Sequence, residues 1–217
     1  MRLAGCIFPA AGSRRRFLAA AAVSGLTFQP NAPAAEPEQN VLGPRAGYSP
    51  QIGTLVSQMI WMRGAVLSTV KGLSIEQLDF LLDDKANRIG ALLLHLAATD
   101  KLYQLNTFGN VGLPDLQTAP AFEQYAIAME LGAPARDAIQ HHPLDFYLSI
   151  LHDTREKTLA EFRKRDDAWL MQVDKSWPWG PTNNLCKWFH VCEHESHHAG
   201  QIAMLRARAT GAKADNG

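Results

Sequence analysis

Apolar residues recur at every third or fourth position over long stretches of this chain, and this spacing constrains its fold more than any other feature. Positions three and four residues apart share one face of an α-helix, so the spacing predicts amphipathic helices. In the first stretch we expect one buried stripe, formed by Ile52, Leu55, Val56, Met59, Ile60, Val66, Leu67 and Val70. Pro50 suits the first turn of this helix and Lys71-Gly72 its end. Arg63 interrupts the stripe, and we expect its stem to pack on the core while its guanidinium reaches water. The alternative is a functional side chain that points into a cavity of the bundle.

Three later segments show the same spacing, at about residues 87–107, 143–165 and 183–208. A short capped turn begins at Ser74, and residues 121–140 are moderately helical with a break near Gly132-Ala133-Pro134. No segment alternates as a β-strand does. We therefore predict an all-α fold, a four-helix bundle with an additional partly helical segment between its second and third helices.

The N-terminus has the composition of a targeting segment. Ser13-Arg14-Arg15-Arg16-Phe17-Leu18 precedes a short apolar stretch and a small-residue site, and it matches the pattern of a twin-arginine export signal. An ordinary arginine-rich signal or an internal basic helix is the alternative interpretation. We predict a signal peptide over 1–34, a linker over 35–49, the bundle over 50–210 and a flexible tail over 211–217. The mature chain is then periplasmic or secreted.

Charge and cysteine usage narrow the possible partners. The formal net charge is zero, so we expect no nucleic acid and no anionic membrane surface as a partner. No apolar run after the N-terminus is long enough to form a stable membrane span. Cys186 and Cys192 lie six residues apart on one predicted helix, which separates them by about 240° around its axis. They cannot bridge each other, and we expect both to be small buried residues.

Histidines mark the last predicted helix. His194 and His198 are four residues apart, so both can reach one metal ion, and His190 makes a competing pair with His194. His197 points elsewhere, toward solvent or a neighbouring helix. His95 lies in the apolar run 91–97 of another helix, where a buried imidazole needs polar partners. Those partners are either a backbone carbonyl or carboxylate of a facing helix, or a metal shared with the last helix.

Several short motifs resemble the DinB-like family in their order and separation. They are residues 87–96 followed by Asp100, Arg155-x-x-Thr158-Leu159, and His194-x-x-x-His198-x-Gly200-Gln201-Ile202, and together they cover about residues 50–208. The resemblance implies a four-helix bundle and a divalent metal, zinc or nickel, held by His95, His194 and His198. It leaves Gly200 as a site of close helix approach, and Gln201 as either a support for the ligands or a packing hydrogen bond. Related bundles often pair, so a homodimer is possible, although no surface stripe in the sequence identifies its face.

The same residues allow three functions. The first is an exported metal-dependent enzyme, of the hydrolase or thiol transferase type, that acts on an unknown small molecule. The second is a zinc metalloprotease, since His194-Glu195-x-x-His198 satisfies the H-E-x-x-H pattern with Glu195 as general base. No histidine or glutamate follows His198, however, so that helix supplies no third ligand. The third is a non-enzymatic, metal-stabilised stress or binding protein.

Overall fold

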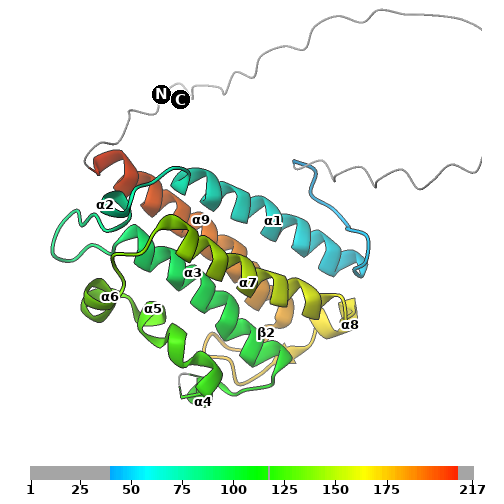
Figure 1. Ribbon diagram of the computed structural model, residues 1–217. Helices are drawn as coiled ribbons and strands as arrows, with labels where there is room; N and C mark the ends of the chain where they lie inside the picture. Colours follow the sequence, from blue (N-terminus) through cyan, green and yellow to red (C-terminus); the bar gives the residue numbers. More distant parts are fainter. Residues whose placement is uncertain (1–39, 117, 210–217) are drawn as a thin grey trace, which may run out of the picture. The chain divides into compact units, whose positions relative to one another are not determined.

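Four long helices dominate the computed structural model, which describes residues 40–116 and 118–209 (Figure 1). They are α1 (Pro50–Val70), α3 (Ile89–Tyr103), α7 (Leu144–Phe162) and α9 (Asn184–Arg208). The predicted all-α bundle is confirmed, and each helix begins within two residues of its predicted start. The predicted signal peptide (1–34) and the whole predicted tail (211–217) lie outside the described residues.

The four helices form a bundle in which neighbouring pairs contact each other to different degrees. α1 packs extensively against α9, and α3 packs against both α7 and α9, whereas α1 and α7 touch at few places. Apolar side chains fill the interior in two groups, one around α3 and one around Trp188 of α9. The seam between α3 and α9 therefore lies inside the bundle, while the seam between α1 and α7 is loosely closed.

Short elements connect the long helices. α2 (Ile75–Leu78) has the predicted cap, since the Ser74 hydroxyl accepts from the Gln77 amide and the Gln77 side chain accepts from the Ser74 amide. The predicted additional segment between α3 and α7 is also present. It consists of the π-helical turn η1 (Gln104–Phe108), α4 (Leu113–Leu116), the 3₁₀ turn η2 (Pro120–Tyr125), α5 (Ala126–Glu130) and α6 (Gly132–Ala138). Leu131, with φ of 58°, separates α5 from α6 just before the predicted break.

A small strand pair corrects the expectation that the chain has no strands. After α8 (Asp167–Leu170), β1 (Val173–Asp174) pairs antiparallel with β2 (Thr182–Asn183), and Val173 lies opposite Asn183. Two-residue strands are too short to produce a visible alternation of polar and apolar residues. Asn183 then caps α9 by accepting a hydrogen bond from the Cys186 amide.

Three apolar or small residues that we expected in the core lie at the surface. Ile60 and Leu67 of α1 are 44% and 41% exposed, because they flank the poorly covered seam between α1 and α7. Cys186 is exposed in the first turn of α9, whereas Cys192 is buried as predicted. The predicted stripe is therefore narrower than the sequence indicated, and α1 has a second apolar face that points outward.

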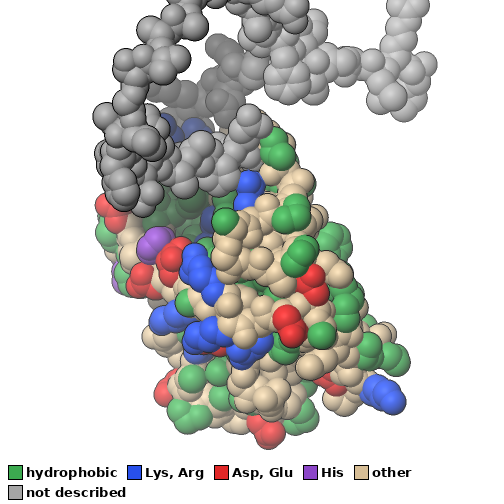
Figure 2. Space-filling model, turned by 90° about the vertical axis from the view of Figure 1, so that its right-hand side faces the viewer, with side chains coloured by type: hydrophobic (Ala, Val, Ile, Leu, Met, Phe, Trp, Pro, Cys, Tyr) green, Lys and Arg blue, Asp and Glu red, His purple; other side chains and the backbone are tan. Residues whose placement is uncertain are grey.

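The surface of the molecule carries charges of both signs. In the view of Figure 2, lysine and arginine side chains lie next to aspartate and glutamate side chains, with hydrophobic side chains between them. Across residues 40–116 and 118–209, no helix combines the length and the apolar character needed to cross a membrane.

Candidate metal centre

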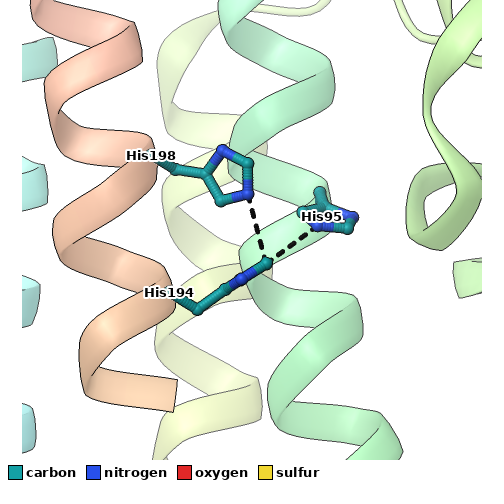
Figure 3. A group of neighbouring side chains, drawn as sticks. All are labelled: His95, His194 and His198. Carbon is teal, nitrogen blue, oxygen red and sulfur yellow. Dashed lines mark hydrogen bonds between the residues drawn. The ribbon is translucent and has the colours of Figure 1, made fainter. Parts of the chain in front are cut away.

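Three histidines meet in the seam between α3 and α9. His95 lies on α3, and His194 and His198 lie one turn apart on α9 (Figure 3). The Nε2 atom of His194 is 2.8 Å from Nε2 of His95 and 3.2 Å from Nε2 of His198. His95 and His198 are buried and His194 is half-buried. The structure thus brings together the three histidines that the sequence analysis singled out, although 99 residues separate His95 from His194.

The second nitrogen of two of these rings has its own partner. His95 Nδ1 lies 2.9 Å from the carbonyl oxygen of Ala128 in α5, and His198 Nδ1 lies 2.7 Å from Oε1 of Gln201. An oxygen of this kind only accepts, so each Nδ1 carries the hydrogen and each Nε2 presents a lone pair. Metal-binding histidines in proteins have this arrangement, with one nitrogen on the metal and the other donating to a fixed acceptor.

The environment keeps the rings neutral, which metal binding requires. Burial lowers the pKa of His95. Burial, together with the neighbouring histidines, lowers the pKa of His194 to about 3. Burial also lowers the pKa of His198, to about 4, although its hydrogen bond with Gln201 acts in the opposite direction. Three neutral imidazoles whose Nε2 atoms converge on one region fit a divalent ion such as zinc.

The spacing of the nitrogen atoms also fits a shared ion. Zinc binds imidazole nitrogen at about 2.0–2.1 Å in tetrahedral sites, which places two ligand nitrogens about 3.4 Å apart. The two shortest Nε2–Nε2 distances, 2.8 and 3.2 Å, lie below this value, and the three ligand atoms all lie within 4.8 Å of one another, so small shifts of the rings would place them around one ion. Three protein ligands leave a coordination position open, as catalytic zinc sites do.

Two other histidines of α9 do not join the group. His190 Nδ1 lies 2.8 Å from the Tyr103 hydroxyl. Burial raises the pKa of Tyr103, so this hydroxyl stays protonated and donates to His190. His197 lies on the surface, where its Nε2 is 3.1 Å from Nε2 of Gln201. The competing pair of His190 with His194 is therefore not the one completed by His95.

Glu195 points away from the histidines and into the bundle. Its Oε1 accepts from Nε of Arg63 on α1 and from Nη2 of Arg155 on α7, both at 2.8 Å. Arg155 also pairs with Asp100 of α3, at 2.9 Å from Nε to Oδ2. Each long helix thus contributes one member of a buried ionic cluster, which we call the four-helix ion cluster: Arg63, Asp100, Arg155 and Glu195. All four side chains are at least nine-tenths buried.

This cluster corrects the expectation for Arg63. Its guanidinium does not reach water but lies in the interior, where Nη1 also donates to the carbonyl of Leu151. A polar residue that interrupts an apolar stripe was the available signal in the sequence, and two interpretations fitted it. Burial and the nearby Arg155 lower the pKa of Arg63, whereas Glu195 and Asp100 raise it.

The structure contradicts the role expected for Gly200 and agrees with one of the two roles expected for Gln201. A side chain at Gly200 would meet nothing within 4 Å, so the expected close helix approach at this position is wrong. Gln201 Oε1 lies 2.7 Å from His198 Nδ1, which agrees with one of the two roles left open for it, the support of a candidate ligand. The Ala128 carbonyl that holds His95 was not predicted, because a backbone acceptor on a distant segment has no signature in the sequence.

The comparison with protein-family models identifies the family. The mycothiol-S-transferase model matches residues 54–211, which span all four long helices and all three histidines. No curated protein matches the chain. This family is DinB-like, in agreement with the motifs around His95, Arg155 and His194. Because the match covers most of the chain, this protein belongs to the mycothiol-S-transferase family.

Proposed function

We propose that this protein is a metal-dependent thiol transferase that joins a small thiol to a small electrophilic molecule. The observation that carries the proposal is the convergence of three Nε2 atoms, from His95, His194 and His198, on one region between α3 and α9. Membership of the mycothiol-S-transferase family supports a thiol as one of the two substrates.

A divalent metal held by these histidines, zinc or nickel, would lower the pKa of a bound thiol and act as a Lewis acid. In the reaction the thiol loses its proton to solvent, a sulfur–carbon bond forms, and the leaving group departs with its electron pair. A strained ring that opens serves equally as the electrophile, and it then takes up a proton.

The chain's own residues prepare the site for this chemistry. The Ala128 carbonyl and the Gln201 amide oxygen fix the orientation of His95 and His198. Burial keeps the three rings unprotonated at neutral pH. Fixed rings lose little conformational freedom when they bind a ligand, so the site is organised in advance.

The protease alternative has less support, because Glu195 is held by two arginines in the interior. A general base has to reach the reacting water, and this carboxylate faces Arg63 and Arg155 instead. Hydrolysis of a small molecule is the second candidate. The predicted export favours it, since a thiol cosubstrate that stays inside the cell would not meet an exported enzyme.

We also propose that the chain is exported by the twin-arginine route to the periplasm or medium. Support comes from Ser13-Arg14-Arg15-Arg16-Phe17-Leu18 and the apolar stretch that follows. This route carries folded proteins, which suits a site assembled from helices far apart in sequence. Replacing Arg14-Arg15 by Lys-Lys should retain the protein in the cytoplasm, as measured by fractionation, and unchanged export would contradict the proposal.

The transferase proposal is tested on protein purified without chelator. We expect bound divalent metal by elemental analysis, and formation of a thioether from a small thiol and 1-chloro-2,4-dinitrobenzene, with release of chloride. His95→Ala and His194→Ala should each remove both the metal and the activity. His197→Ala is the matched control, because it removes an imidazole from the same helix outside the group. A protease confined to α9 predicts little effect of His95→Ala.

A further inference from the structure

The loop between β1 and β2 buries one tryptophan and exposes another. The ring centroid of Trp177 lies 5.7 Å from that of Tyr103 and 4.2 Å from Nζ of Lys187, and this side chain is 6% exposed. Trp179 is 58% exposed, more than any other large apolar side chain among residues 40–116 and 118–209. Because most of its indole faces water, Trp179 contributes little to the stability of the fold.

The loop holds Trp179 in one position. Pro178 and Pro181 restrict the backbone on both sides of it, because the pyrrolidine ring of proline fixes φ. The Gly180 amide donates to the carbonyl of Trp177 at 2.9 Å, and the pairing of β1 with β2 closes the loop at its base. The exposed indole is therefore carried by a rigid turn, and it loses little conformational freedom when a ligand packs against it.

Trp179 lies beside the candidate metal centre. Its ring centroid is 5.1 Å from that of His190, whose own centroid is 5.1 Å from that of His194. The planes of Trp179 and His190 meet at 76°, so the two rings form a corner, which we call the aromatic corner. His190 and His194 are each half-buried, so part of both side chains is open to solvent. A small molecule in the aromatic corner is thus adjacent to the ring of a candidate metal ligand.

We infer that the aromatic corner binds an uncharged, electron-poor aromatic ring, and that this ring is part of the electrophilic substrate. The second half of the inference rests on the proposed function. The face of an indole is electron-rich, and aromatic rings prefer offset-stacked or edge-to-face contacts. A ligand ring stacked on Trp179 lies at a steep angle to His190, because the two rings of the corner do, and this is the edge-to-face arrangement.

The charge beside the aromatic corner favours an uncharged ligand. Oε2 of Glu193 lies 3.9 Å from Nε2 of His190, and this exposed carboxylate repels an anionic substituent on the ring. Nitro and halogen substituents make a ring electron-poor without giving it a charge. Nitroaromatic and haloaromatic compounds therefore have the chemistry that this corner suits.

Binding is measured on the full chain with 1,3-dinitrobenzene, which has an electron-poor ring but no leaving group and quenches the fluorescence of an indole that it contacts. Trp179→Ala should raise its dissociation constant about tenfold, because a stacking contact is lost. Trp179→Phe keeps a ring at this position and should bind within about threefold of the wild type. Trp61→Ala is the matched control, since it removes the same side chain from an exposed position on α1. It should bind as the wild type does, and 3,5-dinitrobenzoate should bind the wild type more weakly than 1,3-dinitrobenzene.

Turnover links the aromatic corner to the reaction. With a small thiol, Trp179→Ala should lower kcat/KM for 1-chloro-2,4-dinitrobenzene about tenfold more than for iodoacetamide, which has no ring. Circular dichroism melts establish that the variant is folded. An equal loss of kcat/KM with both electrophiles would indicate general damage to the centre, and it overturns the role of Trp179 in holding the substrate ring.

Failure of the inference and failure of the proposed function give different results. The aromatic corner is wrong if the wild type does not bind 1,3-dinitrobenzene, if Trp179→Ala binds it as tightly as the wild type, or if Trp61→Ala alone weakens binding. Equal or tighter binding of 3,5-dinitrobenzoate overturns the preference for an uncharged ring. If 1,3-dinitrobenzene binding depends on Trp179 but the wild type forms no thioether, the proposed thiol transfer is wrong and the aromatic corner stands as a binding site.

Discussion

At the scale of single residues, one hydrogen bond determines which nitrogen of a histidine ring faces the candidate metal centre. His95 and His198 each have two nitrogens, and either could face the centre between α3 and α9. The Ala128 carbonyl and Gln201 settle the choice, because each takes the Nδ1 hydrogen and leaves the Nε2 lone pair to the centre. We therefore expect these two acceptors to matter for metal affinity although neither would touch the metal.

Gln201→Leu tests this role directly. The variant keeps the size of the side chain but removes the acceptor for His198 Nδ1. Loss of such a supporting contact typically weakens metal binding by about 10–100-fold. Competition with a chromogenic zinc chelator measures the change, and His197→Ala should bind zinc as the wild type does. Equal affinity for Gln201→Leu and wild type would show that the ring orientation does not depend on this contact.

The three histidines could be selected from the sequence. The directions in which the side chains next to them point could not be predicted. Spacing on one helix placed His194 and His198 together, and the apolar run around His95 marked it as unusual. Glu195 lies between two of the histidines in sequence, yet it faces two arginines on other helices. Which way such a side chain points depends on the helices packed against it, and local sequence does not contain that information.

At the scale of elements, the four-helix ion cluster joins all four long helices at one level of the bundle. Buried ion pairs contribute little net stability when complete, but removing one member leaves charges unpaired in the interior. Glu195→Gln removes the carboxylate that both Arg63 and Arg155 contact.

We expect Glu195→Gln to reduce the free energy of unfolding by about 3–5 kcal/mol, measured by urea denaturation. Glu193→Gln is the matched control, because it is the same substitution at an exposed position of α9. It should change the free energy by less than about 0.5 kcal/mol. If Glu195→Gln abolished activity and left stability unchanged, a catalytic role for this carboxylate would replace the structural one.

The strand pair is anchored to α9 by a buried lysine. Lys187 is 2% exposed, and its Nζ donates to Asp174 of β1 and to Asn106 of η1, both at 2.8 Å. It also lies over the ring of Trp177. The hydrogen bond from Lys187, aided by Ser176, lowers the pKa of Asp174 to about 2.

This shift predicts a pH-dependent contribution to stability. The pKa of Asp174 is lower in the folded chain than the ordinary 3.8, so its stabilisation is complete above 3.8 and is lost as the pH falls through about 2. The stability difference between wild type and Asp174→Asn should therefore be constant from pH 7 to 5 and shrink toward pH 2. Denaturant titrations measure it. In a Lys187→Met background the trend should shrink to the part that Ser176 supplies, and an undiminished trend would assign the effect to another group.

The long helices were predictable, as were the capped turn of α2 and the partly helical segment before α7, whereas the π-helical turn and the strand pair were not. A regular apolar spacing over about twenty residues identifies a helix even where single residues fit several kinds of structure. The ends of α1, α7 and α9 were therefore predicted nearly correctly. The π-helical turn η1 and the strands β1 and β2 each involve a few residues. Their formation depends on contacts such as the one between Lys187 and Asp174, which join segments distant in sequence.

At the scale of the whole molecule, the candidate metal centre links α3 to α9, which are far apart in the chain. A bound ion would therefore stabilise the folded protein, because the unfolded chain does not hold the three histidines together. Free zinc at about 100 times its dissociation constant adds about 2.7 kcal/mol. For a domain of this size that corresponds to a rise in melting temperature of roughly 5–11 °C.

Thermal melts with zinc and with a strong chelator test this linkage. The wild type and His197→Ala should melt at a higher temperature with zinc and lose the gain with the chelator. His95→Ala should respond much less, since two histidines bind zinc more weakly than three and an ion held by α9 alone does not join α3 to α9. Identical melting of the wild type in zinc and in chelator would mean that no ion joins α3 to α9. A strong response of His95→Ala would mean that the ion is held by α9 alone, and the three-histidine site would then be wrong.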